Sequence, residues 1–177
     1  MHPIIYDVAV SADGFIAGPG AEISAFPHEG DIVADYLTRL QNYKTVLMGR
    51  ATYEFGYRFG LDPGANPYPW ARSIVVSSGL SLPGDRADVE LWPDLPLDRL
   101  TALRRDSAGP IYLCGGGILA GYLLDLGQID ILRLKRAPIL LGGGTPLFAP
   151  HSCAANLRLL DQRDYSAGLL YQEFALS

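Results

Sequence analysis

The stretch IYLCGGGILA, residues 111–120, predicts a strand, a turn and the start of a helix. Residues 111–114 are apolar, three glycines follow, and an amphipathic run begins at Ile118. Backbone without side chains at a helix N-terminus can approach a ligand closely, and its free N–H groups favour an anion. A glycine-rich turn can equally serve only to connect a strand to a helix. Two interpretations stay open at this point: a nucleotide-phosphate cradle and a plain connection.

Apolar runs and turn signals on both sides of this stretch predict an α/β fold. Strands that alternate with helices favour a mainly parallel sheet covered on both faces, a three-layer α/β/α arrangement, with an antiparallel edge from the C-terminal strands. The chain shows no repeat and no domain boundary, so we expect a single domain over residues 1–177. The expected strands are 4–10, 45–48, 73–76, 111–114, 129–136, 157–165 and 169–176, and the expected helices are 31–43, 96–106 and 118–126, with a loop at 11–25.

Composition excludes several functional classes. Apolar residues make up 49% of the 177 residues and charged residues 19%, as in ordinary globular proteins. The formal net charge of −5 argues against nucleic-acid binding, which needs a basic surface. No apolar run is long enough to span a bilayer, and no signal peptide is visible after Met1. We therefore expect a cytoplasmic protein with a small-molecule partner and no membrane.

Cysteines and histidines give no sign of a disulfide framework or a metal site. The chain has two cysteines, Cys114 and Cys153, which are far apart and are expected to be reduced. The three histidines share no metal-ligand spacing, so no metal is expected.

Several small loops follow the expected strands, at the sheet edge where ligands of open α/β sheets bind. These are the loop after residue 10, Gly49-Arg50-Ala51-Thr52, the Ser77-Ser78-Gly79 turn and the glycine triplet. Arg50 and Thr52 offer a cation and a hydroxyl beside a helix start, which suits a phosphate. Two glycine-marked helix starts and a Ser-Ser turn in one short chain favour a nucleotide cofactor.

Five stretches, in this order, resemble a known family. SADGFIA (11–17) and PILLGGGTPLF (138–148) are similar to the reductase domain of riboflavin biosynthesis. VLMGRATYE (46–54), IVVSS (74–78) and YLCGGG (112–117) resemble dihydrofolate reductases. The resemblance extends over about residues 4–176 and implies a dihydrofolate-reductase-like fold that binds NADPH.

The same resemblance implies roles for individual residues. Arg50 and Thr52 would contact cofactor phosphates, and Ser77 and Ser78 would lie near the adenosine 2′-phosphate. Gly115, Gly116 and Gly117 would form the pyrophosphate cradle, in which the first Gly-Gly peptide is expected to be cis. Ala9, Ile16 and Ala17 would flank the nicotinamide. The other expected residues of the cofactor site are Gly49, Cys114 and Ile118.

The substrate side carries weaker signals. Dihydrofolate reductases have an acid on the first helix, for which Asp31 and Asp35 are the candidates, and Asp31 is the catalytic residue that the resemblance favours. A helical wheel, however, places Val33, Tyr36, Leu37 and Leu40 on the buried face and both acids on the solvated face. Asp31 could therefore simply complement the helix dipole.

The riboflavin-type substrate carries a ribose phosphate, so its site needs a cation. Arg58, Lys135 or Arg136 could supply it. Each of these residues could equally be an ordinary surface charge. Tyr53 is expected to pack against the rest of the protein, and Glu54 is expected to be a solvated residue on its helix. The zinc-deaminase signature that often precedes this reductase domain, H-x-E followed by P-C-x-x-C, is absent from the sequence.

The sequence thus favours an NADPH-dependent reductase of a small heterocycle. The activity that the resemblance places first is reduction of 5-amino-6-(5-phosphoribosylamino)uracil, and dihydrofolate reduction is the alternative. An NADP-binding module without turnover is the non-enzymatic alternative. The resemblance also implies a homodimer.

Overall fold

The computed structural model describes residues 1–83, 87–150 and 152–177. Its centre is an eight-stranded sheet in the order β5-β4-β3-β6-β1-β7-β10-β9. The strands are β1 (Ile4–Ser11), β3 (Thr45–Gly49), β4 (Arg72–Val76), β5 (Glu90–Trp92), β6 (Ile111–Gly115), β7 (Ile131–Ala137), β9 (Leu157–Asp164) and β10 (Leu170–Leu176). Two short strands, β2 (Phe15–Ala17) and β8 (Thr145–Pro146), form a separate pair.

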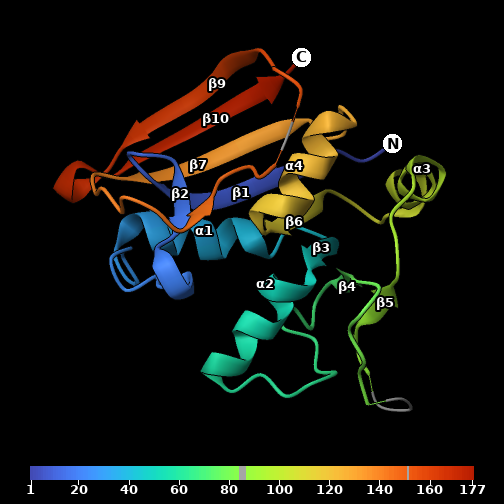
Figure 1. Ribbon diagram of the computed structural model, residues 1–177. Coiled ribbons are helices and arrows are strands. Elements are labelled where there is room, and N and C mark those ends of the chain that lie inside the picture. Colours follow the sequence, from blue (N-terminus) through green and yellow to red (C-terminus); the bar gives the residue numbers. More distant parts are fainter. Residues whose placement is uncertain (84–86, 151) are drawn as a thin grey trace.

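The six strands from β5 to β7 are parallel, and β10 and β9 add an antiparallel edge. In Figure 1 the red β9–β10 hairpin lies at one edge of the sheet and the green β4 and β5 lie toward the other. This is the mixed, mainly parallel sheet that the alternation of strands and helices predicts.

Helices cover both faces of the sheet and divide the core in two. On one face, α3 (Leu97–Asp106) and α4 (Gly117–Asp125) bury Leu100 and Leu123 in a cluster that includes Ile4 and Leu113. On the other face, α1 (Asp31–Leu40) and α2 (Arg50–Phe55) contribute Leu40 and Tyr53 to a second cluster. Coverage on both faces explains why the central strands are nearly continuous apolar runs.

The buried face of α1 differs from the helical-wheel prediction. Ile32 and Leu40 are buried and Tyr36, between them, is half-buried, whereas Leu37 is 53% exposed. The three inward residues follow each other at i+4 steps, and Leu37 lies one residue, about 100° of rotation, past Tyr36. Arg39 also points inward, because its Nε donates to the buried Asp7 carboxylate at 3.3 Å.

Some predicted boundaries were wrong. α1 ends at Leu40 rather than at residue 43, β7 begins at Ile131 rather than 129, and the predicted 11–25 loop contains β2. The short strands β5 and β8 were also missed. Strands of two or three residues have too little pattern to be detected, and pairing with a distant segment decides them.

Candidate functional site

Two helix starts lie side by side at the carboxyl edge of the parallel sheet. β3 and β6 are neighbouring strands, and each leads directly into a helix, β3 into α2 and β6 into α4. Both helices begin at a glycine N-cap, Gly49 and Gly116, without a side-chain capping bond. Free N–H groups and the positive ends of two helix dipoles therefore point toward the same region.

A cavity of about 960 Å³ opens between these helix starts. Tyr122 and Ile118 of α4 form part of its apolar wall, and Thr145 and Pro146 of β8 close another side. Six of the predicted cofactor residues line it: Gly49, Arg50, Thr52, Gly116, Gly117 and Ile118.

The glycine triplet is tightly constrained. The Gly115-Gly116 peptide is cis, as the resemblance predicts. A Cβ on Gly116 would lie 3.2 Å from Thr52 Oγ1, and a Cβ on Gly117 would collide with the backbone carbonyl oxygen of Pro146. Side chains here would fill the space between the two helix starts, so the absence of side chains keeps the cavity open.

Ser77 and Ser78 follow β4, the next strand in the sheet, and they are not among the residues that line the described cavities. Ser77 Oγ accepts the N–H groups of Gly79 and Leu80 at 3.2 and 3.0 Å and shapes the turn. Arg50 Nη1 donates to the Gly79 carbonyl at 3.1 Å and so joins this turn to α2. Arg50 also forms an exposed ion pair with Glu54 at 2.9 Å.

Two smaller cavities continue from the large one. The first, of about 220 Å³, shares Thr52, Gly116 and Thr145 with the large cavity. The predicted residues Ile16, Ala17, Cys114 and Gly115 line it. The second, of about 240 Å³, shares Val8, Ile16 and Ile23 with the first and includes Ala9. Shared lining residues join these spaces into one cleft, in which Ile16 borders both smaller cavities.

The far end of this cleft is polar, unlike its apolar walls. Asp7 of β1 and Lys135 of β7 line it, and Lys135 Nζ lies 2.5 Å from Asp7 Oδ1. The Asp7 side chain is fully buried and that of Lys135 is 12% exposed. Arg39 and Tyr43 OH both donate to Asp7 Oδ2, at 3.3 and 3.2 Å. Lys135 is therefore not a surface charge, and Asp7 compensates its charge.

Burial and charge act in opposite directions on this pair. Burial alone would raise the pKa of Asp7, but the positive charges of Lys135 and Arg39 hold that pKa below its ordinary value. Burial lowers the pKa of Lys135 even though the Asp7 carboxylate opposes this shift. The carboxylate is thus strongly held in its charged form, and the ammonium is more acidic than that of an ordinary lysine.

Phenols surround the pair and remain protonated. Tyr36 OH and Tyr112 OH are 2.8 Å apart, and burial raises the pKa of both groups. Tyr68 OH lies 3.1 Å from the sulfur of Cys114, and burial raises the pKa of that thiol. These groups shape the cleft as neutral hydrogen-bonding partners.

The other substrate-side candidates lie elsewhere. Asp31 is exposed in the first turn of α1 and is not among the residues lining the described cavities. The Asp35 side chain is 47% exposed, as the helical wheel predicts for a solvated residue, and it accepts from Tyr165 OH at 2.5 Å. Arg58 donates to the Gly20 carbonyl beside the first smaller cavity, and Arg136 donates to Gln172.

Sequence reasoning missed Asp7, and it left open whether Lys135 is a substrate cation or a surface charge. Asp7 lies inside the apolar run IIYDVAV, where a charged residue has to be paired if it is buried. A charged residue within an apolar run was therefore a detectable signal, but the sequence does not show which cation pairs with Asp7.

In the part of the chain that the structure describes, no cluster of three or more His, Cys, Asp or Glu side chains could hold a metal ion.

The sequence model of the RibD C-terminal domain matches residues 3–171. The chain belongs to this family. YyaP of Bacillus subtilis (strain 168), an uncharacterized protein, is 27% identical over 94% of this chain and 91% of its own length. Family membership supports a reductase of the RibD type.

None of the helices in the described residues is long and apolar enough to cross a membrane.

Solved structures agree with the RibD C-terminal assignment at the level of fold. A putative riboflavin biosynthesis protein from Shewanella sp. PV-4 is similar with a TM-score of 0.83 at 24% identity, covering 100% of this chain and 99% of the other. A dihydrofolate reductase from Enterococcus faecalis, solved with NADP(H), is similar with a TM-score of 0.68 at 16% identity, covering 99% and 96%. The predicted dihydrofolate-reductase-like fold is therefore confirmed.

Proposed function

We propose that this protein is an NADPH-dependent reductase of a small nitrogen heterocycle. The observation that carries the proposal is the continuous cleft, which begins at two helix N-termini and ends at the Asp7–Lys135 pair. Its anion-favouring end suits a dinucleotide pyrophosphate, and its narrow polar end suits a compact ring with hydrogen-bonding groups.

The residues present fit such a cofactor. Gly116 and Gly117 leave open a cradle that side chains would fill, and the N–H groups at the start of α4 point into it. Arg50, with the turn that contains Ser77 and Ser78, would hold the 2′-phosphate, and Ala9, Ile16 and Ala17 would flank the nicotinamide. When bound, the cofactor supplies a hydride, and the protein's part is to bring two rings together and exclude water.

The substrate that we place first is a ribosylaminopyrimidine of riboflavin biosynthesis, because the chain belongs to the RibD C-terminal domain family. Dihydrofolate is the second candidate, because a dihydrofolate reductase shares this fold; Asp7, the carboxylate in the substrate end of the cleft, is already occupied by Lys135, Arg39 and Tyr43. Asp31, the acid first expected to serve dihydrofolate, lies away from this end.

Cofactor binding and turnover test the proposal together. We expect NADPH to bind more tightly than NADH, and NADPH to be oxidised when 5-amino-6-(5-phosphoribosylamino)uracil or dihydrofolate is added. Asp31→Asn is the matched control and should leave both readings unchanged. Tight NADPH binding without oxidation on either compound would favour a binding module without turnover, and absence of NADPH binding would refute the proposal.

A further inference from the structure

Lys135 is the charged group that the fold presents to the substrate end of the cleft. It lines both the 240 Å³ cavity and a neighbouring cavity of about 230 Å³. β7 pairs with β1 in parallel, Lys135 opposite Ala9, which places its side chain diagonally beside Asp7. Ala9 and Ile16 of the expected nicotinamide site line the same cavity as the ammonium.

The contacts of the ammonium leave one direction for a ligand. Within the described residues, its hydrogen-bond acceptor is Asp7, and its Nζ lies 3.7 Å from the centre of the Tyr36 ring. An ammonium has three N–H donors. The carboxylate and the ring face account for two of them, so a third is free for a group inside the cleft.

Asp7 is itself fully occupied and cannot take the same role. Its carboxylate accepts from Lys135, Arg39 and Tyr43, and its side chain has no exposed surface. The neighbouring phenols are also unsuitable donors, because burial raises the pKa of Tyr36 and Tyr112. The titratable and charged groups around Lys135 are Asp7 on β1, Tyr36 and Arg39 on α1, Tyr112 and Cys114 on β6, Tyr171 on β10 and His28 before α1.

We propose that Lys135 is the catalytic proton donor of this cleft and that Asp7 is a positioning residue that fixes its ammonium. The inference rests on the proposed reductase function. A substrate C=N or C=O carbon gains a hydride from the reduced nicotinamide, and the nitrogen or oxygen gains a proton. The Nζ–H bond of Lys135 breaks, an N–H or O–H bond forms on the substrate, and water reprotonates the amine.

The chain is well suited to a direct test because it has two lysines, Lys135 and the exposed Lys44. In protein labelled with ¹⁵N-lysine, Lys44→Arg assigns the two Nζ resonances. We expect the Lys135 resonance to titrate below the ordinary lysine range, and Asp7→Asn to move its titration further down. A Lys135 resonance that titrates in the ordinary lysine range would overturn the proposal.

Kinetics give the second readout, on single turnovers of NADPH with the compound that the wild-type protein reduces. Lys135→Met should keep the NADPH dissociation constant within about threefold and slow oxidation by about 100-fold or more. Lys44→Met should change neither. Lys135→Gln is the second variant: its amide can still donate to Asp7, which keeps its partners Arg39 and Tyr43, and it should show the same loss even if Lys135→Met is unstable.

The outcomes separate the inference from the proposed function. A folded Lys135→Met variant that oxidises NADPH at the wild-type rate would refute the role of Lys135 and leave the reductase function standing. Failure of the wild-type protein to oxidise NADPH would refute the reductase function itself, and the proton-donor role with it.

Discussion

At the scale of single residues, Gly116 shows how the absence of a side chain creates a binding surface. It lies at the N-cap of α4, and a methyl group there would press against Thr52 Oγ1 at 3.2 Å. The space concerned is the one between the two helix starts. If the triplet only connected β6 to α4, an alanine at Gly116 would leave the affinity for NADPH unchanged. The two interpretations of the triplet therefore predict different NADPH affinities for this variant.

Gly116→Ala should therefore weaken NADPH binding by about tenfold or more, equivalent to about 1.4 kcal/mol. Fluorescence titration with NADPH measures the effect. Gly143→Ala is the control, because a Cβ at Gly143 meets no atom within 4 Å. Equal affinities for the two variants would remove the glycine triplet from the cofactor site.

The Asp7–Lys135 pair predicts a pH dependence of stability. Folding holds the pKa of Asp7 below its unfolded value, so as the pH falls the unfolded chain binds the proton first. The stabilisation from ionised Asp7 is thus complete well above pH ~4 and is lost as the pH falls below it.

Asp7→Asn should lower the free energy of unfolding at neutral pH by about 3–5 kcal/mol, because it leaves buried cations without a carboxylate. The difference from the wild-type protein should shrink as the pH falls below about 4. Urea unfolding at several pH values measures this, with the exposed Asp62→Asn as control. A difference that stays constant with pH would contradict the assigned charge of Asp7.

At the scale of elements, Asp13 joins two loops that cover the cleft. Its carboxylate accepts from Ser11 Oγ at 2.6 Å and from the N–H groups of Leu141 and Gly142 at 3.1 and 2.7 Å. These bonds lower the pKa of Asp13, that from Ser11 most, and link the segment before β2 to the one before β8. We expect the β2–β8 pair, whose residues line the cleft, to depend on this link.

Asp13→Ala should accelerate hydrogen exchange in residues 12–18 and 139–147 and leave the central sheet protected. Mass spectrometry of exchanged peptides measures this, and Glu29→Ala, in another exposed loop, is the control. Unchanged protection in both segments would mean that the backbone bonds between them, such as Ala12 N–H to Ile139 O, are sufficient alone.

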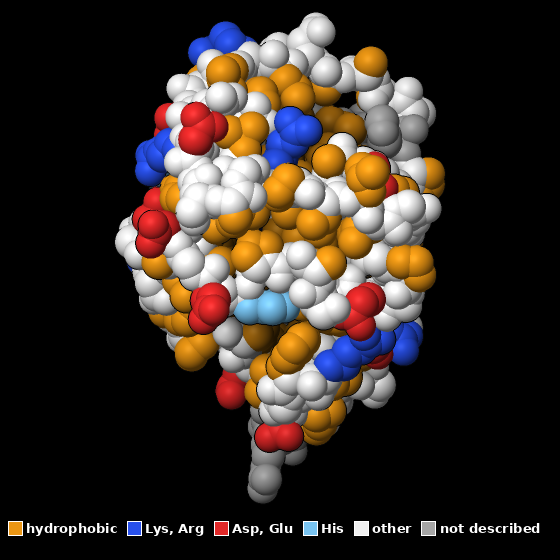
Figure 2. Space-filling view, turned by 90° about the vertical axis from the view of Figure 1, so that its left-hand side faces the viewer, with side chains coloured by type: hydrophobic (Ala, Val, Ile, Leu, Met, Phe, Trp, Pro, Cys, Tyr) orange, Lys and Arg blue, Asp and Glu red, His pale blue; other side chains and the backbone are white. Residues whose placement is uncertain are grey.

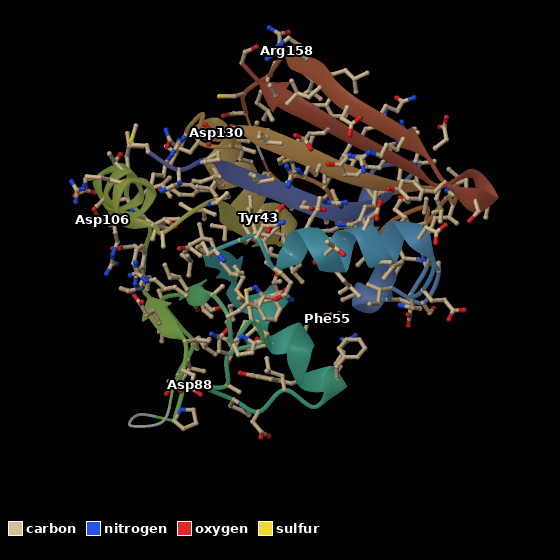
Figure 3. All side chains as sticks on the ribbon, turned by 180° about the vertical axis from the view of Figure 1, so that it is seen from behind. Tyr43, Phe55, Asp88, Asp106, Asp130 and Arg158 are labelled. Atoms are coloured by element: carbon tan, nitrogen blue, oxygen red, sulfur yellow. The ribbon has the colours of Figure 1, made fainter. Side chains whose placement is uncertain are left out.

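Figure 2 views the side of the molecule that carries the β9–β10 turn, and hydrophobic side chains gather in the middle of this face. In Figure 3, Phe55 extends from α2, where it lines one of the smaller cavities, and Tyr43 lies in the interior near the end of α1.

At the scale of the whole molecule, β9 is the outer strand of the sheet and pairs with β10 within the described residues. Its Leu157, Leu159 and Leu160 are 49%, 51% and 42% exposed. An edge strand with exposed apolar side chains can pair with another chain, although β9 also carries Arg158, Asp161, Arg163 and Asp164. The predicted homodimer, which stays a prediction, would bury this edge against a second copy.

Leu159→Lys should therefore shift the protein from dimer to monomer in analytical ultracentrifugation. Leu97→Lys is the matched control, because Leu97 is 50% exposed at the start of α3, for which no contact with β9 is seen among the described residues. A monomeric wild-type protein, or a dimer that tolerates Leu159→Lys, would exclude β9 as the interface.

Local patterns were sufficient for the strand, turn and helix at residues 111–120, for the two glycine-marked helix starts and for the parallel sheet. These features depend on neighbours in the chain: side-chain period, glycine freedom and helix-end chemistry. The cavity at the helix starts then follows from the adjacency of β3 and β6.

Only the tertiary structure decided the inward face of α1 and the pairing of Asp7 with Lys135. The two residues are 128 positions apart and meet because β1 and β7 pair in parallel. Parallel neighbours are connected by long crossovers, so no local pattern sets their register. Once a carboxylate is buried in β1, it attracts Lys135 and Arg39 inward, against the tendency of charged side chains to stay in water.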